Sequence, residues 1–443
     1  MDHFLWKNTL SLTRLDNGIY RITRPLLCIE SVTIAVWVRA GSIYETEMTH
    51  GVNHFVEHLL FAGTTLFPLK KQLTQVVEST GGILNAFSER EGTCYWARCL
   101  AEHFPTTIHV LGELLSHSLF RAEDVESERL AILQELKKHY DHAASWVYAL
   151  LSETLWPKQS LGRYVGGSED TVRQLSRQEI VEYYQRRYQS HNIVIAVVGN
   201  ISDEHASHEV QKYFTDLPNG MPNRSEAEPI ALSVRPMNSP FYSFQVRDLQ
   251  QLHICLGTQT PGRQHPARYA FEMINVMLGK GMSSRFFDQI RTKEGFAYSV
   301  HTTLSMFRYA GAFTIYTGVS PEHGVATIEA IFREMEILAR EGMTLETLIR
   351  AKEFYKGRVR LGAENAKNYA CLLGESLLLD GQVRDILDIL TDVDRVTLDD
   401  VNTALRDRLH PDRFCVVAIG PLHAADRLIA YLKGLGYHDR NYI

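Results

Sequence analysis

The feature that most constrains the fold of this chain is a repeated closing strand. Residues 193–199 read IVIAVVG and residues 414–420 read FCVVAIG, so two apolar runs rich in β-branched residues each end in a glycine. Both runs close a series of strand-like and helical patterns that follow one another in a similar order. The repeat predicts an internal duplication of one α+β unit of roughly 220 residues, a size that is typical of a domain.

The expected elements have the same order in both halves. In the first half, the residue patterns predict strands at 18–22, 31–38 and 193–198, a strand or hairpin at 84–99, and helices at 49–63, 70–79, 107–119, 122–140 and 177–188. In the second half, they predict strands at 252–256, 298–304, 312–316 and 414–419, and helices at 267–278, 324–341, 344–360 and 398–406.

A proline-rich stretch separates the two halves. Residues 217–240 contain five prolines among polar residues, a composition that is typical of a linker. The expected division is therefore an N-terminal domain at 1–217, a linker at 218–240 and a homologous C-terminal domain at 241–443.

The run His54-Phe55-Val56-Glu57-His58 indicates a metal site in the first half. On a helix, positions i, i+3 and i+4 share one face, so both imidazoles can bind one metal ion while Glu57 reaches a water molecule there. Zinc fits best, because two imidazoles and one carboxylate leave one tetrahedral position for water, whose pKa zinc lowers to about 7. Without companions, however, two histidines on an amphipathic helix are more often structural.

The third protein ligand is expected on the helix at 122–140. Glu128 and Glu135 lie seven residues apart on it, which is two helical turns, so both side chains face the same way. Spacing alone does not choose between these two glutamates.

The metal-binding run and its companions resemble the insulinase/pitrilysin family of metallopeptidases, the inverzincins, whose motif H-x-x-E-H reverses the usual zincin order. The resemblance covers nearly the whole chain. It includes the hairpin residues Gly81-Gly82, Asn85-Ala86, Glu91, Thr93 and Tyr95, and the stretch 278–298 in the second half. It implies an α+β fold of two homologous domains, each a mainly antiparallel sheet packed with helices, as in processing peptidases.

The resemblance also implies roles for individual residues. The family takes its third zinc ligand from a glutamate about seventy-seven residues past the second histidine, which is Glu135 here, and Glu128 then matches a supporting glutamate. Arg291 and Tyr298 match an arginine and a tyrosine that bind backbone and carbonyl groups of the substrate. These donors suit an extended peptide and its developing oxyanion.

The expected activity is zinc-dependent cleavage of peptides or unstructured polypeptide segments by an endopeptidase. Glu57 would act as the general base, taking a proton from water and passing it to the leaving amine. Asn85 and Ala86 are expected to bind the substrate. The alternative is a non-catalytic peptide-binding or scaffolding subunit of a heterodimeric processing protease, although such members typically lack a ligand or the base.

The length of the chain has a consequence for assembly. Family enzymes enclose the peptide in a clamshell chamber of two halves, and this chain supplies only one half. The resemblance therefore implies a homodimer, or a heterodimer with a homologous subunit, in which the zinc of one subunit faces the arginine and tyrosine of the other.

Composition excludes several other classes of function. The formal net charge is -6 and no polybasic block occurs, which argues against nucleic acid or an anionic membrane as a partner. The longest apolar runs, such as residues 192–198, are too short to span a bilayer. The six cysteines are scattered without C-x-x-C spacing, which predicts reduced core thiols. With no signal or transit pattern, the expected location is the cytoplasm.

Overall fold

The computed structural model describes residues 10–218 and 240–440, and these residues form two compact units. The first unit contains the described residues up to Leu136, those from Tyr164 to 218, and Val359–Ile389. The second unit contains Lys137–Arg163, residues 240–358 and the described residues from Leu390 onward. Each unit is therefore discontinuous along the chain.

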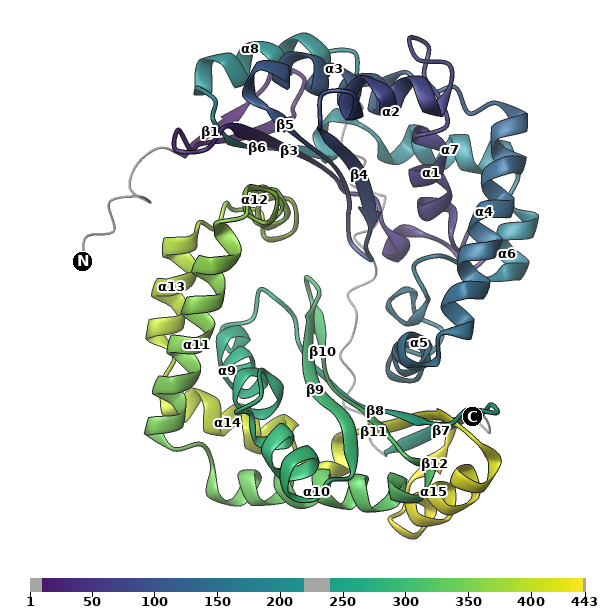
Figure 1. Ribbon diagram of the computed structural model, residues 1–443, viewed down its shortest axis with the longest axis vertical. Helices are drawn as coiled ribbons and strands as arrows, with labels where there is room; N and C mark the ends of the chain where they lie inside the picture. Colours follow the sequence, from purple (N-terminus) through teal and green to yellow (C-terminus); the bar gives the residue numbers. More distant parts are fainter. Residues whose placement is uncertain (1–9, 219–239, 441–443) are drawn as a thin grey trace. The chain divides into compact units, whose positions relative to one another are not determined.

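Each unit is built around one six-stranded sheet (Figure 1). The first sheet has the order β1-β2-β6-β3-β5-β4 and the second the order β12-β7-β11-β8-β10-β9. Pairing is antiparallel except between β2 and β6 in the first sheet, and between β7 and both β11 and β12 in the second. The five strands β2 to β6 correspond in order and direction to β7 to β11, which confirms the α+β class and the duplication.

The strands lie as follows. The first sheet consists of β1 (Ser11–Arg14), β2 (Tyr20–Pro25), β3 (Ser31–Val38), β4 (Ile83–Ser88), β5 (Thr93–Leu100) and β6 (Ile193–Gly199). The second consists of β7 (Phe241–Val246), β8 (Leu252–Pro261), β9 (Ala297–Met306), β10 (Ala310–Val319), β11 (Cys415–Gly420) and β12 (His438–Asp439).

The helices pack on both faces of these sheets. Those of the first half are α1 (Val52–Leu60), α2 (Lys70–Glu78), α3 (Phe104–Ser116), α4 (Ala122–Asp141), α5 (Ala143–Leu155), α6 (Glu169–Gln174), α7 (Arg177–Arg187) and α8 (Asp203–Tyr213). Those of the second are α9 (Arg268–Gly279), α10 (Gly324–Glu341), α11 (Leu345–Ala363), α12 (Ala366–Asp380), α13 (Ile386–Arg395), α14 (Leu398–Arg408) and α15 (Leu422–Gly434). A π-helix covers Phe287–Lys293.

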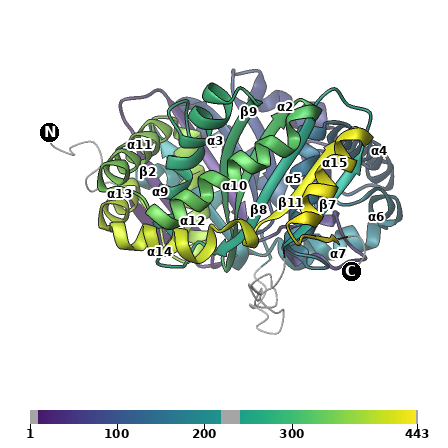
Figure 2. The same cartoon turned by 90° about the horizontal axis from the view of Figure 1, so that it is seen from below.

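The two halves of the chain exchange one helix each. Helix α12, from the second half, packs on β3 and β6 of the first sheet, whose opposite face is covered by α3 and α8 (Figure 1). Helix α5, from the first half, packs on β8 and β11 of the second sheet. The helices α9, α14 and α15 also contact the second sheet, and Figure 2 shows α10 and α15 lying across its strands.

Side-chain size explains how each exchanged helix fits its sheet. Trp37 of β3 and Gly257 of β8 occupy equivalent positions, since each pairs with the second residue of a repeated closing segment. Trp37 packs on Gly374 of α12, where an added Cβ would lie 2.4 Å from the indole ring. Gly257 instead leaves room for Leu151 of α5, which would lie 2.7 Å from an added Cβ. In the first unit the large residue lies on the sheet and the glycine on the helix. In the second unit the glycine lies on the sheet and the large residue on the helix.

The compact units differ from the expected domain division, which stays a prediction. The sheets themselves follow the division into 1–217 and 241–443, but the compact units do not, because Lys137–Arg163 belongs to the second unit and Val359–Ile389 to the first. No helix was predicted at Ala143–Leu155 or Ala366–Asp380. Of the expected linker at 218–240, only residues 218 and 240 are described, and the rest lies outside the described residues.

The structure bears on two expectations from the sequence, the absence of a membrane-spanning segment and the reduced state of the cysteines. Among the described helices, none is both long and apolar enough to cross a bilayer. All six cysteines are free thiols; Cys94, Cys99, Cys255 and Cys415 are buried, as expected for core thiols, whereas Cys28 is exposed. The cytoplasmic location stays a prediction.

Candidate metal centre

Helix α1 presents His54, Glu57 and His58 away from the apolar core of the first unit. Its apolar residues Phe55, Val56 and Leu59 are fully buried against the sheet and neighbouring helices. An α-helix completes one turn every 3.6 residues. When the apolar side chains face the core, His54 and His58 therefore lie on the opposite face of the helix. The burial of the apolar stripe therefore fixes the direction in which both imidazoles point.

The start of α1 is held by glycine and by a buried carboxylate. Gly51 has a φ of +94°, a left-handed conformation, and an added Cβ would lie only 2.8 Å from the Cα of Gly167. The Glu45 carboxylate accepts hydrogen bonds from the backbone N–H groups of Gly51 and Asn53, both at 2.9 Å. These contacts satisfy free donors at the helix N-terminus and place the first turn of α1 firmly.

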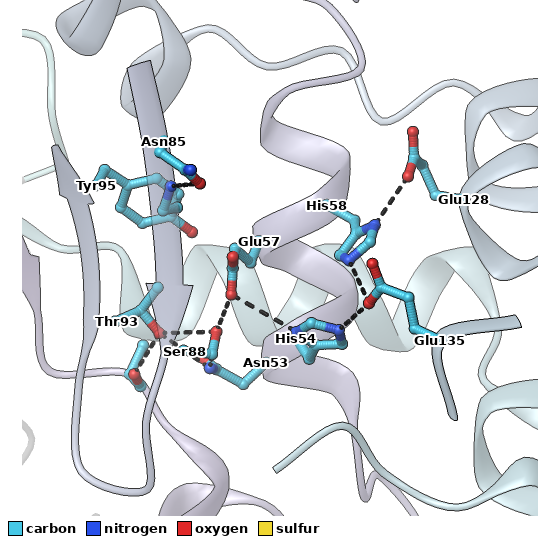
Figure 3. A network of polar contacts seen from close by, with 12 residues as sticks. Asn53, His54, Glu57, His58, Asn85, Ser88, Thr93, Tyr95, Glu128 and Glu135 are labelled. Carbon is cyan, nitrogen blue, oxygen red and sulfur yellow. Dashed lines mark hydrogen bonds and ion pairs between the residues drawn. The ribbon is translucent and has the colours of Figure 1, made fainter. Parts of the chain in front are cut away.

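Three side chains converge beside α1 (Figure 3). The Oε2 atom of Glu135 lies 3.3 Å from His54 Nε2 and 3.5 Å from His58 Nε2. The ligand atoms of the three residues all lie within 4.8 Å of one another. In a tetrahedral zinc site with bonds of about 2.0–2.1 Å, ligand atoms lie roughly 3.3–3.4 Å apart. The two spacings from Glu135 Oε2 are close to this value.

The structure distinguishes Glu128 from Glu135, which sequence spacing alone could not do. Both lie on α4, but Glu128 Oε2 contacts His58 Nδ1 at 2.9 Å, on the side of the ring away from Glu135. Glu128 is also paired with Lys70, whose Nζ lies 3.2 Å from Oε1. Of the two carboxylates, only that of Glu135 contacts Nε2 atoms of both histidines.

The histidines and glutamates of this cluster shift one another's pKa values toward the charged forms. Burial lowers the pKa of His54, but hydrogen bonds to Glu135 and Glu57 and their negative charges outweigh it and raise the pKa to about 9. The hydrogen bond from His54 lowers the pKa of Glu135. Burial raises the pKa of Glu128, but His58 and Lys70 overcome this and hold it below its ordinary value. Both glutamates are thus anionic near neutral pH, as metal ligation and its support require.

Glu57 points to a different neighbour from the two histidines. Its Oε2 accepts a hydrogen bond from Ser88 Oγ at the end of β4, and lies 3.6 Å from His54 Nδ1. The carboxylate therefore lies beside the three-residue cluster without joining it.

Three of the four predicted substrate-binding residues lie on edge strands, and the fourth lies in the π-helix. Asn85 and Ala86 belong to β4, which ends the first sheet, and the Asn85 side chain accepts a hydrogen bond from Ala86 N at 2.7 Å. In the second unit, Tyr298 lies on the equivalent edge strand β9 and is 76% exposed. The guanidinium of Arg291, in the π-helix, lies 5.8 Å from the Tyr298 ring centroid. Arg291 and Tyr298 are thus neighbours, and their role in substrate binding stays a prediction.

Sequence reasoning missed three residues around α1. Ser88 binds Glu57, Asn53 binds Ser88, and Glu45 binds the start of the helix, but none of them carries a motif signal by itself. Thr93 was quoted only as part of the hairpin resemblance, yet its hydroxyl contacts Asn53 at 2.9 Å. The alternation of side chains along β4, which places Ser88 on the same face as Ala86, was the one available signal.

Two family models match consecutive parts of the chain. Residues 28–169 match the model described as Insulinase (Peptidase family M16), and this range contains both histidines and both glutamates of the site. Residues 174–355 match the model described as Peptidase M16 inactive domain, and this range contains Arg291 and Tyr298.

Curated relatives match over nearly their full length. An uncharacterised zinc protease of Streptomyces coelicolor is 33% identical over 419 residues, which cover 94% of this chain and 90% of the relative. The uncharacterised zinc protease YmxG of Bacillus subtilis is 30% identical over 409 residues, which cover 92% of this chain and 97% of the relative.

Solved structures share the fold. A protease from Helicobacter pylori superposes with a TM-score of 0.87 at 18% identity, covering 93% of this chain and 99% of that chain. A peptidase M16 inactive domain from Pseudomonas fluorescens superposes with a TM-score of 0.83 at 17% identity, covering 94% and 98%. At such low identity these matches bear on the fold and not on the activity.

Proposed function

Because this chain belongs to the insulinase family of peptidases, family M16, we propose that it is a zinc-dependent endopeptidase that cleaves peptides or unstructured polypeptide segments. The observation that carries the proposal is the convergence of His54, His58 and Glu135 with the Glu57 carboxylate beside them. Relatives that carry the name zinc protease support zinc as the metal. The donor set of two imidazoles and one carboxylate suits it as well.

Each residue of the cluster has a role in the proposed reaction. His54, His58 and Glu135 would hold zinc, and Glu128 would orient His58 through Nδ1. When bound, zinc lowers the pKa of water and polarises a carbonyl group. Glu57 takes a proton from the attacking water and then gives it to the leaving amine, so that the peptide bond breaks without a charged amide leaving group.

The edge strands supply the contacts to the substrate in this proposal. A strand at the edge of a sheet has free N–H and C=O groups that can pair with an extended peptide, and Asn85 and Ala86 lie on such a strand. Arg291 and Tyr298 would bind the backbone and the developing oxyanion with their N–H and O–H donors. Extended or unfolded segments suit this mode better than folded proteins.

The non-catalytic alternative is less well supported. Its members typically lack a ligand or the base, whereas here all four of the corresponding residues are present and lie close together. Zinc analysis of the purified protein, combined with cleavage of a quenched peptide library read by mass spectrometry, tests the choice. We expect one zinc per chain and cleavage that a metal chelator abolishes. Zinc-free protein that binds peptides without cutting them would favour the scaffolding subunit.

The affinity for zinc is expected to rise with pH. Because the pKa of His54 is raised to about 9 in the metal-free protein, its imidazole is protonated at neutral pH and must lose that proton when zinc binds. The apparent affinity should therefore increase about tenfold per pH unit until about pH 9 and then level off. Competition with a chromophoric chelator at several pH values measures this slope. An affinity that stays flat between neutral pH and pH 9 would contradict the prediction.

Removal of the Tyr298 hydroxyl is expected to slow the reaction without affecting zinc. In Tyr298→Phe, kcat should fall by roughly tenfold to a hundredfold, at or below the cost of a lost oxyanion donor, because the side chain is largely exposed. KM and zinc content should stay unchanged. Tyr431→Phe, in α15 of the same unit, is the matched control and should keep the wild-type kcat. Wild-type turnover in Tyr298→Phe would remove this residue from the proposed site.

We also propose that the chain works as a homodimer or pairs with a homologous subunit, enclosing the substrate in a chamber. The chain spans 90% and 97% of two relatives' lengths, so it is a short member, and it carries both the metal cluster and the Arg291–Tyr298 pair. Size exclusion with light scattering tests the assembly on the pure protein. A fully active monomer would contradict it.

A further inference from the structure

Ser88 donates a close hydrogen bond from its hydroxyl group to Oε2 of Glu57, the same oxygen that lies 3.6 Å from His54 Nδ1. It ends β4, and its Oγ also lies 3.1 Å from Asn53 Nδ2 and 3.4 Å from Thr93 Oγ1 (Figure 3). Asn53 and Thr93 are fully buried, so their polar atoms depend on one another and not on solvent. The direction of each hydrogen bond in this group can therefore be worked out.

The direction is set at Thr93 and passes to Asn53. The Thr93 hydroxyl lies 2.8 Å from the carbonyl oxygen of Ala40, which can only accept, so Thr93 donates its single hydrogen there. At its 2.9 Å contact with Asn53, Thr93 must then accept, which means that Asn53 presents its NH₂ group. The Asn53 amide oxygen consequently faces Tyr183, whose single hydroxyl hydrogen is shared between this oxygen at 3.2 Å and the Gly41 carbonyl oxygen at 3.3 Å.

Asn53 passes this direction on to Ser88 and Glu57. One amide hydrogen of Asn53 binds Thr93, and the other binds Ser88 Oγ. Because an amide NH₂ group only donates, Ser88 accepts from Asn53 and keeps its own hydrogen for the Glu57 carboxylate. A hydrogen bond to an ionised acceptor is of the strong kind. Within the described residues, no protein group binds Oε1 of Glu57, so the chain constrains only one of the two carboxylate oxygens.

We propose that Ser88 is a positioning residue for Glu57, holding Oε2 so that Oε1 stays free to accept the proton from water. The inference rests on the proposed function. It assigns to the buried set Tyr183, Asn53 and Thr93 the task of orienting the Ser88 hydroxyl. An inverted Asn53 amide would present its oxygen to Ser88 and accept the Ser88 hydrogen, so that Glu57 would lose the Ser88 donor.

Two substitutions at position 88 test the proposal in the zinc-loaded protein. In Ser88→Ala, kcat is expected to fall roughly tenfold to a hundredfold, the effect of losing a hydrogen bond to a charged group, with KM and zinc content unchanged. Ser88→Thr keeps the hydroxyl and suits a strand, so it should restore most of the turnover. Crystal structures should show one Glu57 orientation in the wild type and more than one in Ser88→Ala.

A control variant distinguishes a role of Ser88 in positioning Glu57 from a role in packing alone. Ser118→Ala removes a partly buried serine of the same unit that bonds only to the backbone oxygens of Leu60 and Leu114, and it should keep wild-type kcat. Wild-type kcat in Ser88→Ala overturns the proposal, and so does a loss that Ser88→Thr fails to restore. If the wild-type protein cleaves no peptide, the proposed function fails, and the Glu57 orientation in the Ser88→Ala crystal still decides the role of Ser88.

Discussion

Replacing Glu57 by glutamine is expected to leave zinc in place and to lower kcat by roughly 10²- to 10⁴-fold, the usual contribution of a general base. The glutamine amide has nearly the shape of the carboxylate, so packing should change little. It cannot take a proton from water at neutral pH, however. Because Glu57 lies beside the metal cluster and contributes no atom to it, zinc content should stay at the wild-type level.

The measurement needs kinetics and metal analysis on the same preparations. Turnover of a quenched peptide gives kcat and KM, and zinc content by atomic emission shows whether the site is loaded. Glu126→Gln on α4 is a suitable control, because this exposed carboxylate pairs with Arg129 and not with the cluster. Near wild-type turnover in Glu57→Gln would remove the base from the proposed mechanism, and loss of zinc would mean that Glu57 is a ligand.

Much of the fold could be predicted because the two halves repeat. Strands such as β6 and β11 are apolar throughout, since helices cover both faces of their sheets, and such runs are recognisable in sequence. The exchange of α5 and α12 could not be predicted. A helical pattern does not say which of two similar sheets it will cover, and here the choice depends on contacts such as Trp37 with Gly374.

The convergence of side chains at the candidate site could be predicted from the sequence in part, but the hydrogen bond from Ser88 to Glu57 could not. His54, Glu57 and His58 are close in sequence, so helix geometry alone places them together. Glu128 and Glu135 have equal claims by spacing, and only the positions of the two imidazoles separate them. Ser88 lies 31 residues from Glu57 in sequence, and no periodicity links a strand end to a helix.

The exchanged helix α12 connects the site to the second half of the chain. The Arg39 guanidinium after β3 donates to the backbone oxygen of Leu378, and Lys367 Nζ lies 5.1 Å from the centre of the Trp96 ring on β5. Strand β5 in turn pairs with β4, which carries Ser88. The hairpin beside Glu57 is therefore packed against a helix that is synthesised more than 270 residues later. Residues 1–217 alone lack this helix.

Replacing Glu135 by glutamine is expected to remove zinc and activity together. The Glu135 carboxylate contacts Nε2 of both His54 and His58, and an uncharged amide is a much poorer zinc ligand. If protein zinc sites bind with about 10–16 kcal/mol, one of four positions accounts for roughly 3–4 kcal/mol, on the order of a hundredfold to a thousandfold in affinity. Adding zinc to metal-free Glu135→Gln should then raise its melting temperature little, whereas it should stabilise the wild type clearly.

The same substitution at Glu128 is the matched control, because both glutamates lie on α4 and spacing gave them equal claims. Glutamine at 128 can still accept a hydrogen bond from His58 Nδ1, so the affinity for zinc should fall by only about 10- to 100-fold, as for other residues that support a ligand. Saturating zinc should therefore restore the activity of Glu128→Gln and not that of Glu135→Gln. The reverse result would mean that Glu128 is the ligand and Glu135 its support, since a supporting residue affects how tightly zinc binds but a ligand also determines what the bound zinc can do.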